Sequence, residues 1–265
     1  MSRIEEAMEK HARGGGASTL VRSPRRPASE PAARAARAPG GVDEHVVSFH
    51  RPRSGLTENF KQIKIVIQNM LPEGDNKVIM FTSSLGDEGK TIASLNFAGA
   101  IALDQSRRVI IVDADMRAPK VHTLLGMKVQ AGFGDLLMSD APVESVAVAT
   151  PVPGLSAILC GEIPPNPGEL FGGERSRQVF AELKEKYDCV VVDTPPVLPV
   201  VDTVHMAAFA DGVVLIVEAA RTGRKKLQRA VQLLNNANAS VMGFLLNKDR
   251  ASGADYRTPR YYGGG

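Results

Sequence analysis

Short apolar, β-branched runs alternate along the chain with longer stretches that have helical spacing. Runs that are apolar at nearly every position are typical of strands buried on both faces of a parallel sheet. Alternation of this kind predicts an α/β fold, in which a mostly parallel sheet is flanked by helices. We expect strands at 76–83, 108–113, 155–160, 188–193, 212–218 and 241–247, helices at 90–104, 174–186 and 224–238, and short helices up to about 138.

Composition divides the chain into three parts. Residues 1–53 are rich in Pro, Ala and Arg and are predicted to form a disordered basic arm. The arm lacks the interleaved aromatic residues of a nucleic-acid surface, so no nucleic acid is expected as a partner. Residues 54–250 carry the α/β pattern, and 43% apolar content in 265 residues suffices for one such domain. Residues 251–265 are polar and glycine-rich, which predicts a flexible tail.

A glycine-rich segment, Ser84-Leu85-Gly86-Asp87-Glu88-Gly89-Lys90-Thr91, lies between the first expected strand and the first long helix. It matches the phosphate-loop pattern except that Ser84 replaces the first glycine. Backbone N–H groups in such a turn and the positive end of the helix dipole converge on phosphate oxygens. Lys90 is expected to reach the β and γ phosphates and Thr91 to bind Mg²⁺. The predicted nucleotide-binding residues are Gly86, Asp87, Glu88, Gly89, Lys90, Thr91 and Ile92.

Acidic residues end two of the other expected strands. Asp113 and Asp115 follow one run, and Asp193 ends another. The carboxyl ends of parallel strands meet at one edge of the sheet, so these carboxylates are predicted to converge on the phosphate site. Asp193 fits a Walker B role in the Mg²⁺ shell, and Asp113 and Asp115 point to the same side of an extended segment. Each acid taken alone could instead cap the following turn.

Several further segments have distinctive sequences. They are the Asp-x-Asp-x-Arg block at 113–117, Arg117-Ala118-Pro119 with His122 and Gly126, the 161–170 segment with its Pro-Pro-Asn-Pro run, 193–197 with Asp202, and 243–247. Through these segments and the phosphate loop, the sequence resembles the bacterial tyrosine kinases of capsule and exopolysaccharide synthesis, which are P-loop proteins unrelated to the eukaryotic kinase fold. The resemblance covers most of residues 58–262.

The resemblance implies a phosphoryl transfer from ATP, with Mg²⁺, to tyrosines near the C-terminus, mostly in a neighbouring protomer. Asp113 is the favoured residue to orient or deprotonate the phenol, whose pKa is near 10. The last core strand ends in Asn247, which the resemblance places near the adenine. An equal alternative is that Asn247 is an ordinary polar residue at the end of a strand and has no role in binding. The implied catalytic residues are Lys90, Asp113, Asp115 and Asp193, the metal-binding residues Thr91, Asp115 and Asp193, and the phosphoacceptors Tyr256, Tyr261 and Tyr262.

Partners are also implied by the resemblance. No apolar stretch reaches the roughly 20 residues of a membrane span, so the chain is expected to be cytoplasmic. Stand-alone members of the family are recruited to the inner face of the membrane by a transmembrane polysaccharide co-polymerase, whose cytoplasmic tail activates them. A cognate tyrosine phosphatase is implied as well. The first residues are similar to the branch that accompanies exosortase-linked polysaccharide systems.

The segment just ahead of the phosphate loop resembles the E-x-x-R-x-x-R helix that assembles these kinases into rings. Lysine occupies both basic positions and cannot make the bidentate fork of arginine, so a weaker homo-oligomer is expected. The alternative is an amphipathic surface helix that packs on the core. The ring residues would be Glu58, Lys61 and Lys64, and the packing residues Phe60, Ile63 and Ile67.

Two other functions remain open at this stage. A partitioning-type ATPase would act as a nucleotide-switched dimer, but its phosphate loop carries an additional lysine where this chain has Leu85. A non-catalytic regulator would bind ATP and act by docking alone. Arg117 fits either a site-shaping ion pair, which we favour, or a phosphate contact. Cys160 and Cys189 lie in apolar runs and are expected to be inert buried thiols.

Overall fold

A computed structural model describes residues 33–34, 41–71 and 76–248 of the chain. Its central feature is one eight-stranded sheet with the order β1-β4-β5-β3-β6-β2-β7-β8. All neighbouring strands are parallel except β4 and β5, so the predicted fold class is confirmed. The strands are β1 Ala33–Arg34, β2 Lys77–Ser83, β3 Val109–Asp113, β4 Val148–Ala149, β5 Leu155–Ile158, β6 Cys189–Asp193, β7 Gly212–Glu218 and β8 Val241–Asn247.

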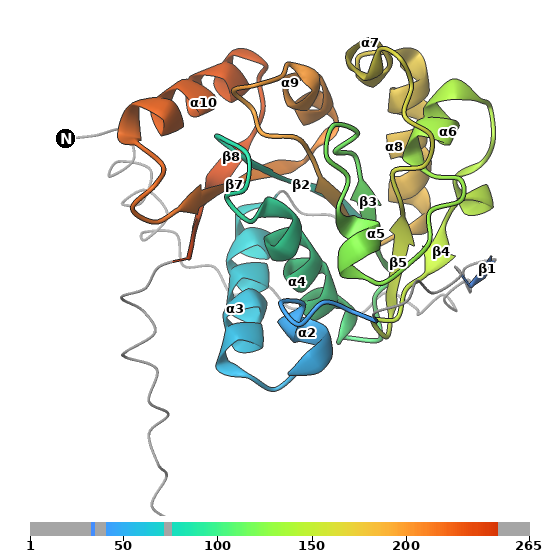
Figure 1. Cartoon of the computed structure of the whole chain (residues 1–265), viewed down its shortest axis with the longest axis horizontal. Helices are drawn as coiled ribbons and strands as arrows, with labels where there is room; N and C mark the ends of the chain where they lie inside the picture. Colours follow the sequence, from blue (N-terminus) through green and yellow to red (C-terminus); the bar gives the residue numbers. More distant parts are fainter. Residues whose placement is uncertain (1–32, 35–40, 72–75, 249–265) are drawn as a thin grey trace, which may run out of the picture.

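Helices cover both faces of the sheet, as Figure 1 shows. One layer contains α2 Val47–His50, α3 Gly55–Met70, α4 Lys90–Ala102 and α5 Val121–Leu124. The other contains α6 Phe133–Met138, α7 Pro167–Phe171, α8 Glu174–Lys186, α9 Asp202–Met206 and α10 Arg224–Asn236, with the 3₁₀ turns η1 Val143–Ser145 and η2 Ala207–Phe209.

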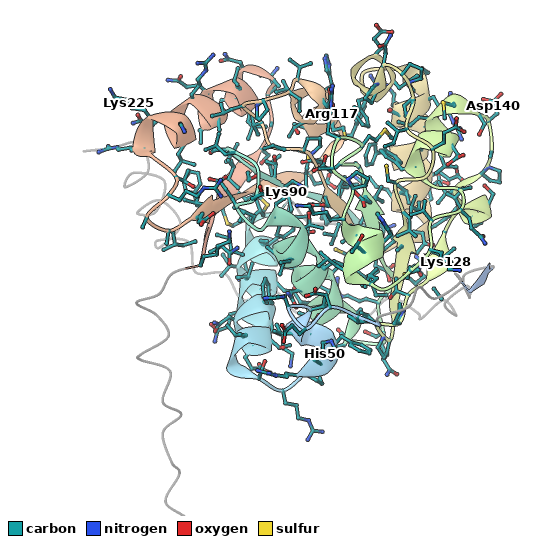
Figure 2. The ribbon with its side chains drawn as sticks, viewed as in Figure 1. His50, Lys90, Arg117, Lys128, Asp140 and Lys225 are labelled. Carbon is teal, nitrogen blue, oxygen red and sulfur yellow. The ribbon has the colours of Figure 1, made fainter. Side chains whose placement is uncertain are left out.

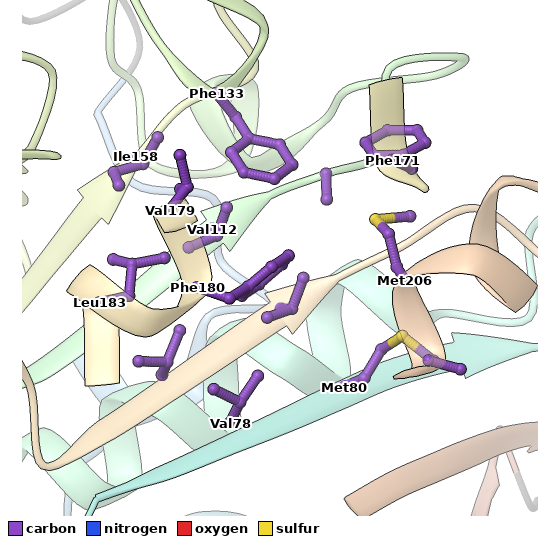
Figure 3. Close-up of a cluster of buried hydrophobic side chains, with 14 of the residues drawn as sticks. Val78, Met80, Val112, Phe133, Ile158, Phe171, Val179, Phe180, Leu183 and Met206 are labelled. Atoms are coloured by element: carbon purple, nitrogen blue, oxygen red, sulfur yellow. The ribbon is translucent and has the colours of Figure 1, made fainter. Parts of the chain in front are cut away.

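Two hydrophobic cores fill the spaces between the sheet and these layers. Alternate residues of β2 enter opposite cores, because successive side chains of a strand point to opposite faces. Val78 and Met80 enter the core that also contains Phe180 of α8 and Met206 of α9, which Figure 3 shows. Ile79 and Phe81 pack on the α4 side. Both faces of the strand are therefore buried, which explains why the sequence of β2 is apolar at nearly every position.

The strand order brings the predicted functional segments to one edge of the sheet. β2 lies between β6 and β7, and β6 also pairs with β3. In the register of these parallel strands, Phe81 lies opposite Asp193, and Asp193 lies opposite Asp113. The loop that follows β2 and the acids that end β3 and β6 therefore meet at the carboxyl edge, where open α/β sheets bind ligands.

The folded unit begins earlier than the sequence predicted. Val46 has no exposed surface, and Phe49 packs against the α4-side core. The backbone N–H of Ser48 donates to Asn96 Oδ1 of α4 at 3.0 Å. The prediction that the disordered arm continues through residue 53 is therefore wrong for residues 41–53, because apolar residues there complete the core over α4.

Candidate nucleotide site

The loop between β2 and α4 adopts the left-handed backbone conformation that its glycine allows. Gly89 is the N-cap of α4, with φ = 91°. Asp87 also has a positive φ of 63°, and its carboxylate pairs with Lys120 at 3.2 Å. Ser84, which replaces the usual first glycine, is fully buried and its main chain accepts a hydrogen bond from Leu198 N at 3.3 Å. The main chain of the turn therefore accommodates the serine, while its buried Oγ has no hydrogen-bond partner among the described residues.

A buried carboxylate inside the loop fixes its shape. Glu88 has no exposed surface, and its Oε2 accepts a hydrogen bond from Leu85 N at 3.0 Å. Its other carboxylate oxygen hydrogen-bonds to the hydroxyl of Thr222, in the connection between β7 and α10. Glu88 therefore ties the phosphate loop to a second loop, which the sequence did not predict. Thr222 gave no signal in the sequence, because its contact spans more than a hundred residues.

The end of β8 holds the loop from the other side. Asn247 Nδ2 donates to the carbonyl oxygen of Glu88 at 2.9 Å, and Lys248 Nζ donates to that of Asp87 at 2.7 Å. Lys248 also pairs with Glu218 at 3.0 Å. Asn247 thus lies beside the nucleotide loop, and its predicted contact with adenine stays a prediction. Lys248 was missed by the sequence reasoning, since a lysine after a strand is an ordinary surface residue.

Lys90 is the centre of a buried charge cluster. Its Nζ lies 2.6 Å from Asp115 Oδ2 and 3.5 Å from Asp193 Oδ2. Thr91 Oγ1 donates to the same Asp193 oxygen at 2.7 Å. Burial alone lowers the pKa of Lys90, but the negative charges of Asp193 and Asp115 outweigh it, so the pKa of Lys90 is raised. The structure thus brings together all four residues, as the sequence predicted from separate motifs.

Asp113 lies behind this cluster. It has no exposed surface, and its Oδ2 accepts a hydrogen bond from Val121 N at 3.1 Å. Burial, with the charge of Asp193, raises the pKa of Asp113 well above its usual range. Asp115 lines the adjacent cavity and Asp113 does not. Asp115 is therefore the acid of the pair that faces an incoming group, in contrast to the sequence-based preference for Asp113.

A cavity of about 500 Å³ opens beside the loop. Its lining includes four cationic side chains, those of Lys90, Arg117, Lys120 and Lys248. Figure 2 labels Lys90 near the middle of the molecule and Arg117 above it in the view. The volume lies within the range of small-molecule sites, and the excess of cations suits a polyphosphate. The rest of the lining is Gly86, Asp87, Gly89, Thr91, Ile92, Asp115, Ala118, Leu124, Pro195, Pro196, Pro199 and Val200.

Arg117 forms the ion pair that the sequence favoured. Its Nε lies 2.9 Å from Asp202 Oδ2, and its second terminal nitrogen lies 3.3 Å from Oδ1. Asp202 is buried and opens α9, whereas Arg117 is half exposed. The backbone N–H groups of Arg117 and Ala118 donate to Asp115 Oδ1 at 3.2 and 3.0 Å. The pair therefore anchors the segment that orients Asp115.

The oxygen atoms at this site fit a divalent cation such as Mg²⁺. Asp193 Oδ1 is buried and has no hydrogen-bond partner within the described residues, while Oδ2 is shared with Thr91 and Lys90. Hydroxyl and carboxylate oxygens are the ligands that Mg²⁺ prefers. Burial raises the pKa of Asp193, and the charge of Lys90 opposes this effect. Thr91 and Asp193 are therefore the residues that would hold the metal. The predicted metal contact of Asp115, which pairs with Lys90, stays a prediction.

Helix α3 contains the segment expected to form rings. Phe60, Ile63 and Ile67 pack against the core, as the surface-helix alternative predicted. The three residues expected to assemble subunits into a ring make ion pairs within the chain. Lys61 pairs with Glu58 at 2.6 Å, and Lys64 pairs with Asp104 at 3.8 Å. Their role in an oligomer stays a prediction.

The remaining sequence predictions concern cysteines, tyrosines and the membrane. Cys160 and Cys189 are free and buried, as the sequence predicted, and burial raises the pKa of each thiol to about 12. Their lack of reactivity stays a prediction. Tyr256, Tyr261 and Tyr262 lie outside the described residues. Within the part of the chain that the structure describes, no helix combines the length and apolarity that crossing a bilayer requires.

Comparison with known proteins extends this picture. A family model described as "AAA domain" matches residues 76–242. The tyrosine-protein kinase YwqD of Bacillus subtilis is 29% identical over 211 residues, which cover 80% of this chain and 89% of YwqD. CapB of Staphylococcus aureus is 31% identical over 216 residues, covering 80% of this chain and 92% of CapB. The chain matches 27% of the length of a longer relative, the tyrosine-protein kinase ptk of Acinetobacter johnsonii.

Solved structures agree with these relatives. The kinase domain of the Escherichia coli tyrosine kinase ETK superposes with a TM-score of 0.72 at 27% identity, covering 76% of this chain and 79% of that domain. A plasmid partition protein of Borrelia burgdorferi, at 18% identity and a TM-score of 0.55, covers 64% of this chain and 78% of its own and shares the fold. The chain belongs to the AAA domain family and, within it, to the group of the bacterial tyrosine-protein kinases.

Proposed function

We propose that this chain is an ATP-dependent protein-tyrosine autokinase that acts in capsule or exopolysaccharide polymerisation and export. The observation that carries the proposal is the buried cluster of Lys90, Thr91, Asp115 and Asp193 beside a cavity lined by cations. This cluster combines a phosphate-binding lysine with oxygen ligands for a metal and a carboxylate that faces the cavity. Those are the groups that phosphoryl transfer requires.

Catalysis in this proposal depends on positioning and charge. The loop amides and Lys90 bind the β and γ phosphates of ATP, and binding draws Lys90 away from Asp115. Bound Mg²⁺ would supply further neutralisation of the phosphate charge. The tyrosine oxygen forms a bond to the γ phosphorus while the bond to the ADP oxygen breaks. Asp115 accepts the phenolic proton, and Asp113 positions the following helix through Val121 N.

The phosphate acceptors in this proposal are the tail tyrosines Tyr256, Tyr261 and Tyr262. The other tyrosine, Tyr187, is a poor candidate because it is partly buried and its burial raises the pKa of its hydroxyl. Transfer in trans, from one protomer to the tail of another, would make the reaction depend on assembly. Glu58, Lys61 and Lys64 of α3 are the proposed assembly residues.

The relatives of the chain support a proposal about its partners. The solved structure of the chimerical protein CapA2B2 superposes on this chain with a TM-score of 0.71 at 26% identity. We propose that a transmembrane co-polymerase recruits the chain to the inner face of the membrane and activates it through a cytoplasmic tail. A tyrosine phosphatase would reverse the modification.

Two full-length variants mixed in one reaction test this function. The enzyme carries phenylalanine at the three tail tyrosines, and the acceptor carries Lys90→Met with its tail intact. With Mg-ATP and the candidate activator's cytoplasmic tail, phosphotyrosine should appear on the acceptor. ATP hydrolysis without any phosphotyrosine would contradict the proposal and favour a nucleotide-switched ATPase of the partitioning type.

A further inference from the structure

Helix α10 presents an exposed surface that carries positive charge alone. Its sequence, RKKLQRAVQLLNN, contains no acidic residue, and Arg221 lies just before it. Figure 2 shows Lys225 at the outer end of this helix, directed away from the body of the protein. We call this the α10 cationic surface, and it consists of the exposed residues Arg221, Arg224, Lys225, Lys226 and Arg229.

The charges of this surface do not serve the stability of α10. Three cations occupy its first turn, next to the positive end of the helix dipole, where acidic residues are the favourable choice. The N-cap, Gly223, offers no side-chain hydrogen bond. Among the described residues, Arg221 pairs with Glu218 at 2.8 Å, while the four cations of the helix itself form no ion pair. An anionic partner would relieve this unfavourable arrangement.

Lys248, the last described residue before the C-terminal tail, lies beside this surface. Ala219 N donates to Asn247 O at 2.9 Å, which joins the β7–α10 connection to the end of β8. Glu218 contacts both Arg221 and Lys248, the last described residue before the tail. Lys248, next to the tail, and Arg221, at the start of the α10 cationic surface, therefore pair with the same carboxylate, that of Glu218.

The tail is long enough to cover α10. Tyr256 follows Lys248 by eight residues, a reach of roughly 27 Å in an extended chain. The 13 residues of α10 span roughly 20 Å. Tyr261 and Tyr262 lie farther along the sequence, and an extended segment of that length is longer than the helix. All three tyrosines can therefore meet the surface of their own chain.

Phosphorylation reverses the charge of the tail relative to this surface. In the unmodified tail, basic side chains exceed acidic ones, so the surface repels it weakly. Each phosphotyrosine adds about −1.5 to −2 charges at pH 7 and three acceptor oxygens, which suit arginine and lysine. The charged residues of the unmodified tail are Asp249, Arg250, Asp255, Arg257 and Arg260.

We propose that the tyrosine-phosphorylated tail binds the α10 cationic surface of its own chain. The inference rests on the proposed function, because it requires phosphate on Tyr256, Tyr261 or Tyr262. Docking in this way removes the modified tail from the active site of a neighbouring protomer. The phosphorylated product is thereby sequestered, and assembly through the tail is weakened as the reaction proceeds.

A binding experiment with a synthetic peptide tests the proposal. The peptide covers residues 249–265, carries phosphate at all three tyrosines and is followed by fluorescence anisotropy. The binding partner is the full chain with Lys90→Met, so the result does not depend on kinase activity. We expect binding that weakens with added salt, and at least tenfold weaker binding of the unphosphorylated peptide. Equal binding of the two peptides would overturn the proposal.

The combined variant Arg224→Gln, Lys225→Gln and Lys226→Gln locates the site. It should bind the phosphopeptide about tenfold more weakly, since three exposed charge pairs are lost. The variant should fold at least as well as the parent, because it relieves repulsion from the helix dipole. Unchanged binding would place the phosphopeptide elsewhere and would overturn the proposal, even if the chain is a kinase.

A matched control removes the same number of charges at other exposed positions, through Arg51→Gln, Arg53→Gln and Lys128→Gln. This control should bind the phosphopeptide as the parent does. Loss of binding in the control equal to that in the α10 variant would show a non-specific charge effect and contradict the proposal. Vesicles of phosphatidylglycerol provide the other comparison. If the α10 variant loses vesicle binding while phosphopeptide binding persists, the surface serves anionic lipid and the proposal is wrong.

Discussion

The conformation of Gly89 makes a quantitative prediction about stability. Gly89 has a φ of 91°, in the left-handed region that an L-residue occupies at a cost of about 1–2 kcal/mol. A Cβ atom at this position would also overlap the side-chain amide of Asn247, which hydrogen-bonds to Glu88 O. Loss of that bond costs about 1 kcal/mol. Gly89→Ala should therefore lower the free energy of unfolding by about 2–3 kcal/mol.

Gly86 supplies a control within the same loop. A Cβ atom there meets no atom within 4 Å, and its φ lies outside the left-handed region. Gly86→Ala should leave stability nearly unchanged, or raise it slightly by restricting the unfolded chain. In a domain of this size, the Gly89→Ala difference corresponds to a fall in Tm of about 4–12 °C.

Thermal unfolding followed by circular dichroism, without nucleotide, compares the two variants directly. A large fall in Tm for Gly89→Ala with little change for Gly86→Ala supports the described loop. Equal shifts for the two variants, or no shift for Gly89→Ala, would refute the left-handed phosphate loop as the resting conformation.

Three further predictions concern other parts of the molecule. With pKa values of about 12, the thiols of Cys160 and Cys189 should be ionised in only about one molecule in 10⁴ at pH 8. Iodoacetamide should therefore label the native protein slowly, label it faster as the pH rises, and label the urea-unfolded protein readily. Rapid labelling of the native protein would contradict the burial of the two cysteines. Arg117→Lys replaces the bidentate contact with Asp202 by a point charge and should lower the free energy of unfolding by roughly 1 kcal/mol, as measured by urea denaturation. An unchanged free energy of unfolding would show that the ion pair does not stabilise the fold. Chelation of Mg²⁺ should weaken the binding of fluorescent ADP to the parent chain but change little for Asp193→Asn, and equal sensitivity of the two would argue against Asp193 as a metal residue.

Much of the fold was predictable because the central strands are buried on both faces. β2, β3, β6 and β7 are apolar at nearly every position, and each lies close to its expected bounds. The site was predictable for the same reason. Once the strands are parallel, acids at their carboxyl ends must approach the loop after β2, as Asp193 and Asp115 approach Lys90.

Features that depend on distant contacts were not predictable. The hydroxyl of Thr222 and the amine of Lys248 reach the phosphate loop across more than a hundred residues, and nothing in their local sequence signals it. The early start of the domain was missed because α2 has four residues, too few for helical periodicity. Burial of Asp113 behind Asp115 likewise depends on the packing of α5, which spacing alone does not reveal.

The central claim, tyrosine autophosphorylation that depends on the phosphate-loop lysine, is tested most directly by mapping phosphotyrosine. The full-length chain and its Lys90→Met variant are incubated with Mg-ATP and the candidate activator's cytoplasmic tail, then analysed by mass spectrometry. We predict phosphate on one or more of Tyr256, Tyr261 and Tyr262 in the parent chain and none in the variant. Phosphate at equal levels in both chains, or nucleotide turnover with unmodified tyrosines, would contradict the account.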